Sequence, residues 1–326
     1  MVLVSIANNH KVGLAVAEAI QLLGGMKRFV HAQDTVVIKP NLVFAVPPFT
    51  GFTTDYPVVQ AIIRLCQRCD PAELIIAEGS GGVDTELAFR SCGYPELAKQ
   101  FGVKLVDLNK SPTLKVAVPG GQCVKTLQVP KILLECDAII NVPKLKLYKQ
   151  VPGRPDWVSL AVKNILGALP DQGSYSATRP ARMTVECSPE FWAPGGKFYN
   201  PSYNQWWRPR GEKRRIHKNL SQGLVDVHMV LKPRLNIIDA FTVSNDINMT
   251  ETKAEPPFNL NTILASQDPL ALDFIAAKIG GIDPFDIPYL RNAAERRIGE
   301  SDYDRIQVCG TPLDQIITIW ETAFKS

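Results

Sequence analysis

Short runs of β-branched residues alternate with segments of helical periodicity along most of the chain, and this alternation is what most restricts its fold. We predict strands over residues 2–6, 35–39, 73–77, 103–107, 114–118, 138–142, 235–239, 261–265 and 305–308. We predict helices over residues 12–23, 55–68, 84–90, 157–169, 217–231, 268–279, 289–297 and 313–324. Such alternation is typical of a parallel sheet between helical layers, so we expect an α/β, Rossmann-like three-layer fold with a mostly parallel sheet.

Residues 171–216 depart from this pattern. They are rich in Pro, Gly, Trp, Tyr and Arg and show no sustained period. A connection of this length inside a compact domain usually has a function, and the many aromatic residues argue against disorder. We therefore expect one α/β domain over residues 1–326, with 171–216 as a long irregular insertion or lid.

Charge and hydropathy restrict the partners. The formal net charge of +4 allows an anionic small ligand but falls short of the basic character typical of nucleic-acid-binding proteins. No apolar run reaches the roughly 18 residues of a membrane span. The first ten residues lack the basic segment that opens a signal peptide. We expect a cytoplasmic protein without a membrane partner.

The end of the strand over 35–39 is the first candidate site. In open α/β sheets, ligands bind outside the carboxyl ends of the strands. Pro40 cannot continue a central strand, so Lys39 and Asn41 are expected at its mouth. The alternative is a surface lysine beside a turn.

A glycine-rich stretch, residues 78–82, follows the strand over 73–77 and precedes a helix. Backbone N–H groups at Gly81 and Gly82 could approach an anion at the helix start. Glu78 would repel a phosphate there, and a flexible strand-to-helix turn is an equally open interpretation.

Residues 139–149 give the most informative pattern. If the chain stays extended past Pro143, Lys144, Lys146 and Tyr148 share one side, and the intervening leucines point toward a core. Mutual repulsion would lower the pKa of each lysine, and such a lysine can act as an acid, base or nucleophile. The alternative is a solvated edge strand with protective lysines.

Three further positions are ambiguous. Lys163 and Asn164 lie off the apolar face of their predicted helix, so the pattern alone places them in solvent. Asp268 is explained as a helix cap before Pro269, whereas capping does not explain Asp273. Asp239 ends a strand and could serve a metal or act as a base, but a structural role is favoured because no His or Cys stands beside it.

Cysteines and basic residues point to no defined site. Of the seven cysteines, only Cys66 and Cys69 form a CxxC pair, and helical packing explains them best. We assign no metal site and leave the cofactor open. A basic run over 208–218 follows Trp206 and Trp207; it could bind single-stranded nucleic acid, but a solvated loop or a lid over an anion is the more common case.

The chain resembles the family called domain of unknown function 362 (DUF362). The matching stretches are Lys39-Pro40-Asn41, Thr53-Thr54-Asp55, residues 141–146, residues 162–167, Lys232-Pro233 with Ile237-Ile238-Asp239, and residues 263–273. Many members of this largely uncharacterised family carry ferredoxin-type cysteine clusters, so the resemblance implies a possible redox association. It also implies one shared site, made of Lys39, Asn41, Lys144, Lys146, Lys163, Asn164 and Asp273.

This sequence departs from the family pattern in three places. Tyr148 stands where the family usually has histidine, and its reference pKa is about 10 rather than about 6.5. The ferredoxin cysteines are missing, which argues against a built-in cluster. The acidic, glycine-containing stretch after Asp239 is replaced by residues 245–250.

Our first hypothesis is an enzyme that acts on a small substrate with a carboxylate or phosphate group. Lys39, Lys144 and Lys146 would hold the anion with Gly81 and Gly82, and Asn41 and Asn164 would orient it. Lys163 or Tyr148 would move a proton, Asp273 would hold a lysine in place, and the insertion would exclude water.

Two alternatives stay open. The first is a redox protein or oxidoreductase that uses an external electron donor or distant cysteine ligands of an iron–sulfur cluster. The second, a nucleic-acid-binding module, is disfavoured.

Overall fold

The structure, a computed structural model, describes residues 1–43, 45–81, 83–147, 158–170, 216, 219–244 and 257–325. Its strands are β1 (Val2–Asn8), β2 (Thr35–Lys39), β3 (Glu73–Glu78), β4 (Lys104–Asp107), β5 (Thr113–Ala117), β6 (Thr126–Pro130), β7 (Ala138–Asn141), β8 (Leu235–Val243), β9 (Phe258–Ser266) and β10 (Ile306–Gly310). Its helices are α1 (Val12–Leu22), α2 (Tyr56–Gln67), α3 (Thr85–Ser91), α4 (Tyr94–Phe101), α5 (Lys131–Glu135), α6 (Ala161–Asn164), α10 (Leu220–Val230), α11 (Pro269–Ile279), α12 (Pro288–Glu295) and α13 (Leu313–Lys325).

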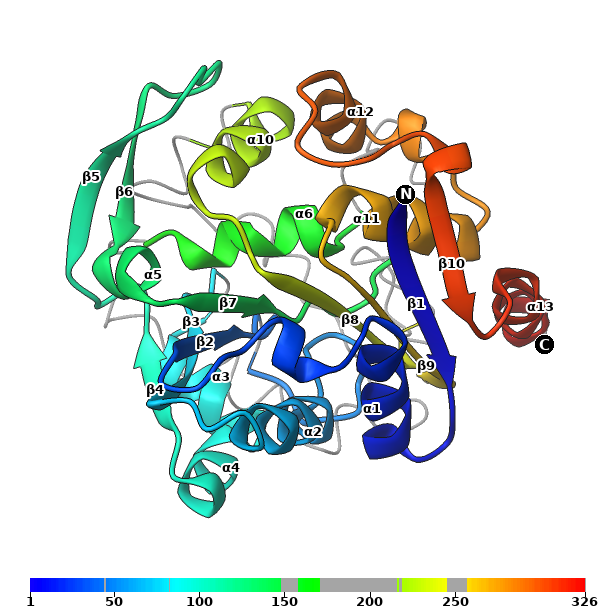
Figure 1. Cartoon of the computed structure of the whole chain (residues 1–326), viewed down its shortest axis with the longest axis horizontal. Coiled ribbons are helices and arrows are strands. Elements are labelled where there is room, and N and C mark those ends of the chain that lie inside the picture. Colours follow the sequence, from blue (N-terminus) through cyan, green and yellow to red (C-terminus); the bar gives the residue numbers. More distant parts are fainter. Residues whose placement is uncertain are drawn as a thin grey trace.

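An eight-stranded sheet runs through the molecule in the order β10-β1-β9-β8-β7-β2-β3-β4 (Figure 1). Every neighbouring pair is parallel except the two pairs made by β9, which runs antiparallel to β1 and β8. β5 and β6 form a separate antiparallel hairpin. The mostly parallel α/β sheet predicted from the alternation is therefore confirmed.

Helices cover both faces of this sheet, which gives three layers (Figure 1). Alternate side chains of β2 show how the layers are held. Val36 and Ile38 pack with α1, α2 and α4 on one face, whereas Val37 packs with α10 on the other. A further core on that second side joins α6 and α11 to β8 and β9. Apolar side chains thus fill both sides of the central strands, as expected for a sheet buried between helices.

The segment over 157–169 differs most from its predicted helix. Leu160 is extended, with φ −132° and ψ −154°, and the helix begins only at Ala161. It continues after Asn164 as a 3₁₀ turn, Ile165–Ala168. The apolar side chains that produced the helical pattern are buried. They lie partly in the extended residues before α6 and partly in the 3₁₀ turn after it, and not in one continuous helix.

α4, α5 and β6 were not predicted. Each is eight residues long or shorter, so it offers too few periodic positions for a pattern to stand out.

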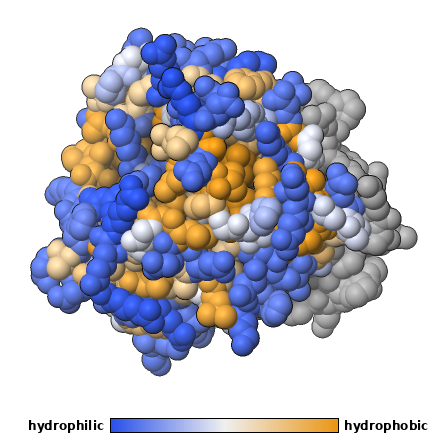
Figure 2. Space-filling model, turned by 45° about the vertical axis from the view of Figure 1, so that its right-hand side comes forward, coloured by the Kyte–Doolittle hydropathy of each residue, from blue (hydrophilic) through white to orange (hydrophobic). Residues whose placement is uncertain are grey.

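The single-domain organisation stays a prediction, and so does the insertion, since residues 171–215 lie outside the described residues. Among the described residues, no helix has the length and apolar character needed to cross a membrane. On the face shown in Figure 2, an apolar area is bordered by hydrophilic side chains.

Candidate functional site

Charged and amide side chains gather where neighbouring strands end. β7, β2 and β3 are adjacent in the sheet, and their last residues are Asn141, Lys39 and Glu78. Asp239 lies in β8, next to β7. All four side chains are buried. The carboxyl edge of the sheet therefore carries the cluster, as the general rule for open α/β sheets predicts.

The chain stays extended after β7. Lys144 forms a parallel bridge with β8, and Lys146 an antiparallel bridge with the segment before α6. Leu145 and Leu147 are buried in the core formed with α11, while both lysines point away from that core and are also buried. The predicted alternation is thus confirmed at these four positions, whereas Tyr148 lies outside the described residues.

Lys39 is paired with a carboxylate. Its Nζ atom lies 3.1 Å from both carboxylate oxygens of Glu78, which also accept hydrogen bonds from the N–H groups of Leu42 and Gly79. A Cβ atom on Gly167 would lie 2.5 Å from Glu78 Oε1, so the backbone there covers the pair closely. Burial lowers the pKa of Lys39, and Glu78 opposes that shift. The ammonium is already compensated, which argues against its expected role of holding an anion.

Lys144 lies between two carboxylates. Its Nζ atom is 2.8 Å from Asp55 Oδ2 and 2.9 Å from Asp239 Oδ2. Burial alone would lower its pKa, but the negative charges of Asp239 and Asp55 raise it above the ordinary value. The expectation that repulsion lowers the pKa of Lys144 is therefore wrong, because the two carboxylates outweigh the effect of burial. Lys144 joins β8 to the start of α2 and is not available for an anion.

Lys146 differs from both. Its Nζ atom donates to Asn41 Oδ1 at 2.5 Å, and no carboxylate of the described residues forms an ion pair with it. Burial lowers its pKa to about 7, helped by the positive charges of Lys163 and Lys144 and opposed by Glu78. At neutral pH this side chain therefore exists as a mixture of amine and ammonium.

α6 brings two more predicted residues to the cluster. Asn164 is buried and accepts a hydrogen bond from Asn41 Nδ2 at 2.9 Å, and Lys163 is half-buried and close enough to affect Lys146. The prediction that Asn164 lies in solvent is wrong, because the side of α6 that carries Asn164 faces the sheet edge. Asp273 accepts from the backbone N–H groups of Ala161 and Val162, at 2.7 and 2.8 Å. It therefore holds the segment that carries Lys163, and not a lysine ammonium as expected.

The glycine-rich loop is tied up in local bonds. The N–H of Gly79 donates to Glu78, and the N–H of Ser80 donates to Thr85 Oγ1 at 3.2 Å. Gly81 has interactions of its own, and Gly82 lies outside the described residues. Anion binding by Gly81 and Gly82 stays a prediction, and the loop as described serves the strand-to-helix turn.

The structure thus brings most of the predicted residues together. The members it gathers are Lys39, Asn41, Lys144, Lys146, Lys163 and Asn164. The carboxylate partners were missed: Glu78 was considered only as a charge that repels a phosphate, Asp239 as an isolated carboxylate and as part of the resemblance, and Asp55 only as part of the resemblance. Glu78 ends the strand next to Lys39, and this signal could have revealed the pair.

No metal centre is found among the described residues, where no three His, Cys, Asp or Glu side chains gather around one point. Cys66 and Cys69 are free thiols buried at the end of α2. The helical packing predicted for Cys66 is confirmed, and Cys69 lies just after the helix end, as predicted.

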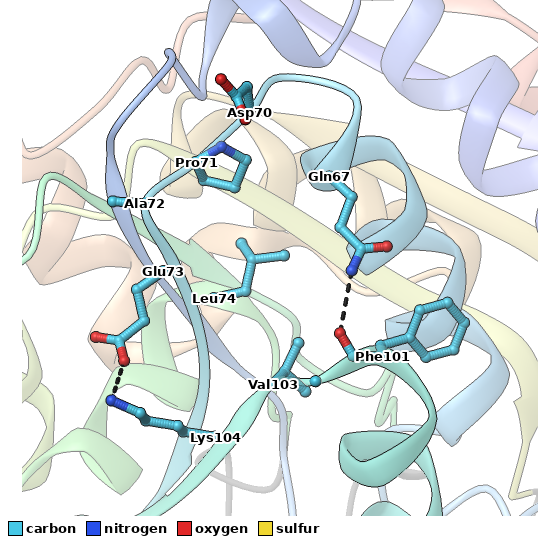
Figure 3. Close-up of a pocket in the computed structure, with 10 residues that line it drawn as sticks. Gln67, Asp70, Pro71, Ala72, Glu73, Leu74, Phe101, Val103 and Lys104 are labelled. Carbon is cyan, nitrogen blue, oxygen red and sulfur yellow. Dashed lines mark hydrogen bonds and ion pairs between the residues drawn. The ribbon is translucent and has the colours of Figure 1, made fainter.

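A hollow of about 310 Å³ lies at the opposite edge of the sheet (Figure 3). Glu73 and Leu74 open β3 there, and Lys104, which opens β4, forms an ion pair with Glu73. Gln67 Nε2 donates to the carbonyl of Phe101 at 3.1 Å across the rim. This hollow is separate from the cluster, because the cluster lies at the carboxyl ends of the strands.

Comparisons with known proteins agree with the resemblance seen in the sequence. The family model described as "Domain of unknown function (DUF362)" matches residues 36–278. The thylakoid-associated protein sll1697 of Synechocystis sp. is 24% identical over 280 residues, which cover 86% of this chain and 73% of that protein.

Two solved structures are similar at 13% sequence identity. They are the lactate racemase apoprotein from Thermoanaerobacterium thermosaccharolyticum, with a TM-score of 0.44, and a protein from Thermotoga maritima, with a TM-score of 0.37. The alignments cover 88% and 84% of this chain but only 58% and 60% of those chains.

Proposed function

The chain belongs to the DUF362 family, whose function is unknown, and we propose that it is an enzyme that moves a proton on a small anionic substrate, with Lys146 as the acid–base group. The observation that carries the proposal is the contrast among three buried lysines. Lys39 and Lys144 have carboxylate partners, whereas Lys146 has the neutral Asn41 and a pKa lowered to about 7.

A pKa near the working pH suits general acid–base catalysis. The base form must be populated, and its conjugate acid must still give the proton up readily. A lysine with an ordinary pKa of 10.5 is almost entirely protonated at neutral pH, so it is a poor base. Lys146 exists in both forms at that pH and can take a proton from a substrate or return one.

Charge also supports an anionic substrate. Protonated Lys146 lies near Lys163, whose positive charge disfavours the ammonium form of Lys146. Among the described residues, the carboxylates of Glu78, Asp55 and Asp239 in this cluster are engaged by other lysines. A carboxylate or phosphate bound beside Lys146 would compensate this charge and raise the pKa of Lys146.

The proposal assigns roles to the remaining residues. Asn41 holds one N–H of Lys146, Lys163 attracts the anion, and Asp273 fixes the segment that carries Lys163. Lys39 and Lys144 build the edge of the sheet. Tyr148 stays a candidate for a second proton transfer, and residues 171–216 stay a candidate lid.

The cytoplasmic location belongs to the same proposal. The redox alternative is tested separately by an anaerobic absorbance spectrum, in which flavin or iron–sulfur bands would support it. The nucleic-acid alternative predicts binding to single strands that weakens steeply with salt.

Ligand binding gives the first test. Thermal unfolding is followed with a panel of mono- and dicarboxylates and phosphate esters, for the wild type, Lys146→Met and Lys131→Met. Lys131 is an exposed lysine on α5, so it receives the same substitution far from the cluster. We expect at least one anion to raise the Tm of the wild type and of Lys131→Met but not of Lys146→Met.

Proton transfer is then tested with the anions that bind. Exchange of a substrate proton for deuterium is followed by NMR in D₂O. Exchange by the wild type that is lost in Lys146→Met supports the proposal. It is overturned if no anion stabilises the wild type, or if Lys146→Met binds and exchanges like the wild type.

A further inference from the structure

Four buried asparagines form one hydrogen-bonded chain that starts at Lys146. Lys146 Nζ donates to Asn41 Oδ1, and Asn41 Nδ2 donates to Asn164 Oδ1 at 2.9 Å. Asn164 Nδ2 donates to Asn141 Oδ1 at 2.8 Å, and Asn141 Nδ2 donates to Asn236 Oδ1 at 2.9 Å. The four amides come from the segment after β2, from α6, from β7 and from β8, and each is at most 6% exposed.

Backbone carbonyls fix the direction of this chain. Asn236 Nδ2 faces the carbonyl of Gln267 at 3.2 Å, and Asn141 Nδ2 also faces the carbonyl of Ala161 at 3.1 Å. Asn164 Nδ2 likewise faces a backbone carbonyl, that of Pro40 just after β2, at 3.4 Å. A carbonyl can only accept, so turning any of these amides would set two oxygens against each other in a buried place.

The direction matters at the Lys146 end. Since Asn164 presents its oxygen to Asn41, Asn41 must use its Nδ2 there and turn its Oδ1 toward Lys146. Lys146 must therefore donate to Asn41. In the amine form this uses one N–H, so the lone pair cannot point at Asn41 and is left for another partner.

We propose that Asn164, Asn141 and Asn236 are positioning residues that lock Asn41 in one orientation and so set the direction in which Lys146 accepts and releases its proton. This rests on the acid–base role of Lys146 proposed above. No proton travels along the chain, because amides neither gain nor lose protons readily at neutral pH. Each amide dipole turns its oxygen toward Lys146, so the chain also favours the ammonium form.

The chain works against several other charges. Among the described residues, the charged groups that act most on Lys146 are Lys163, Lys144 and Lys39, which disfavour its ammonium form, and Glu78, which favours it. Breaking the chain leaves these charges in place. It leaves Asn41 able to turn its N–H groups toward the ammonium in place of its oxygen, and this change makes protonation of Lys146 harder.

NMR titration of protein labelled with [ε-¹³C]lysine tests the positioning role without any chemical modification of the lysines. The Cε shift of Lys146, assigned from its absence in Lys146→Met, reports the protonation of that residue alone. Asn164→Leu is expected to lower the midpoint by about one pH unit, since Asn41 is then no longer held with its oxygen toward the ammonium and the hydrogen bond to that charged group weakens. Asn236→Leu is expected to lower it less, because Ala161 still orients Asn141.

Two further variants keep the test decisive. Asn164→Ala removes the same amide with less bulk if Asn164→Leu does not fold. Asn8→Leu removes another amide, whose Nδ2 donates to the Leu260 carbonyl at 2.8 Å on β9, so it reports a general loss of stability and should not move the midpoint.

The outcomes separate the two proposals. A wild-type midpoint near the ordinary lysine value would overturn the role of Lys146 itself. A wild-type midpoint near 7 that stays unchanged in Asn164→Leu, Asn164→Ala and Asn236→Leu would overturn the positioning role and leave the proposed function standing.

Discussion

Lys146 Nζ lies 2.5 Å from Asn41 Oδ1, so the buried ammonium has a neutral acceptor where the two neighbouring buried lysines have carboxylates. This difference in partner separates a lysine that can titrate near neutrality from lysines that hold the sheet edge together. A buried ammonium that is paired with a carboxylate holds its proton tightly, because losing the proton would leave the carboxylate buried without its partner. A buried ammonium whose partner is neutral loses its proton more readily. The geometry around Lys146 therefore supports the proposed acid–base role, whereas Lys39 and Lys144 stabilise the sheet edge.

Removing Lys144 tests its structural role. Lys144→Met would leave the carboxylates of Asp55 and Asp239 buried without their ammonium, which costs about 3–5 kcal/mol of unfolding free energy. Urea unfolding measures this cost, with Lys131→Met as the exposed control. Adding Asp55→Asn and Asp239→Asn should recover part of the loss. A change below about 1 kcal/mol in Lys144→Met would show that Lys144 does not hold this edge.

Gly167 is expected to tolerate no side chain. A Cβ atom there would lie 2.5 Å from Glu78 Oε1 and 2.8 Å from Lys39 Nζ, so Gly167→Ala must displace a buried ion pair. We expect a loss of about 1–3 kcal/mol. Gly13→Ala is the matched control, because nothing lies within 4 Å of its added Cβ in α1 and helix propensity favours alanine there. Equal stability of the two variants would contradict the close cover seen at the pair.

His228 predicts a specific dependence of stability on pH. Its Nε2 atom lies 2.9 Å from the Val162 carbonyl, and burial lowers its pKa from 6.5 to about 4. Between these values the unfolded chain binds the proton and the folded one does not. Stability is therefore full above about pH 6.5 and falls by about 3 kcal/mol toward pH 4.

Unfolding curves of His228→Gln against the wild type measure this contribution. The variant should lose less stability between pH 6.5 and 4, while His10→Gln, at an exposed position, should follow the wild type. Parallel curves for the wild type and His228→Gln would mean that His228 is protonated equally well in both states.

The location of the candidate site could be predicted from the sequence, but the pairing of its charges could not. The rule for strand ends and the two-residue alternation placed Lys39, Lys144 and Lys146 at one edge of the sheet, and the structure gathers them there. Which carboxylate meets which lysine depends on strand order. Asp55 and Lys144 are separated by 89 residues, and no local pattern indicates that they meet.

The asparagines show the same limit. Asn164 lies off the apolar face of its predicted helix, so periodicity placed it in solvent. It is buried because that helix is short, begins only at Ala161, and turns its polar side toward Asn41 and Asn141. Burial of a polar face is a tertiary property, and only the family resemblance pointed to it.

The protonation midpoint of Lys146 in the wild-type protein decides whether this side chain can act as a base at neutral pH. We would follow its [ε-¹³C]lysine signal from about pH 5 to 11, assigned with Lys146→Met, with and without an anion that stabilises the protein. We expect a midpoint near pH 7 that rises when the anion binds. A midpoint near the ordinary lysine value of 10.5 would rule out the acid–base role, since Lys146 would then stay a cation at neutral pH and could not act as a base.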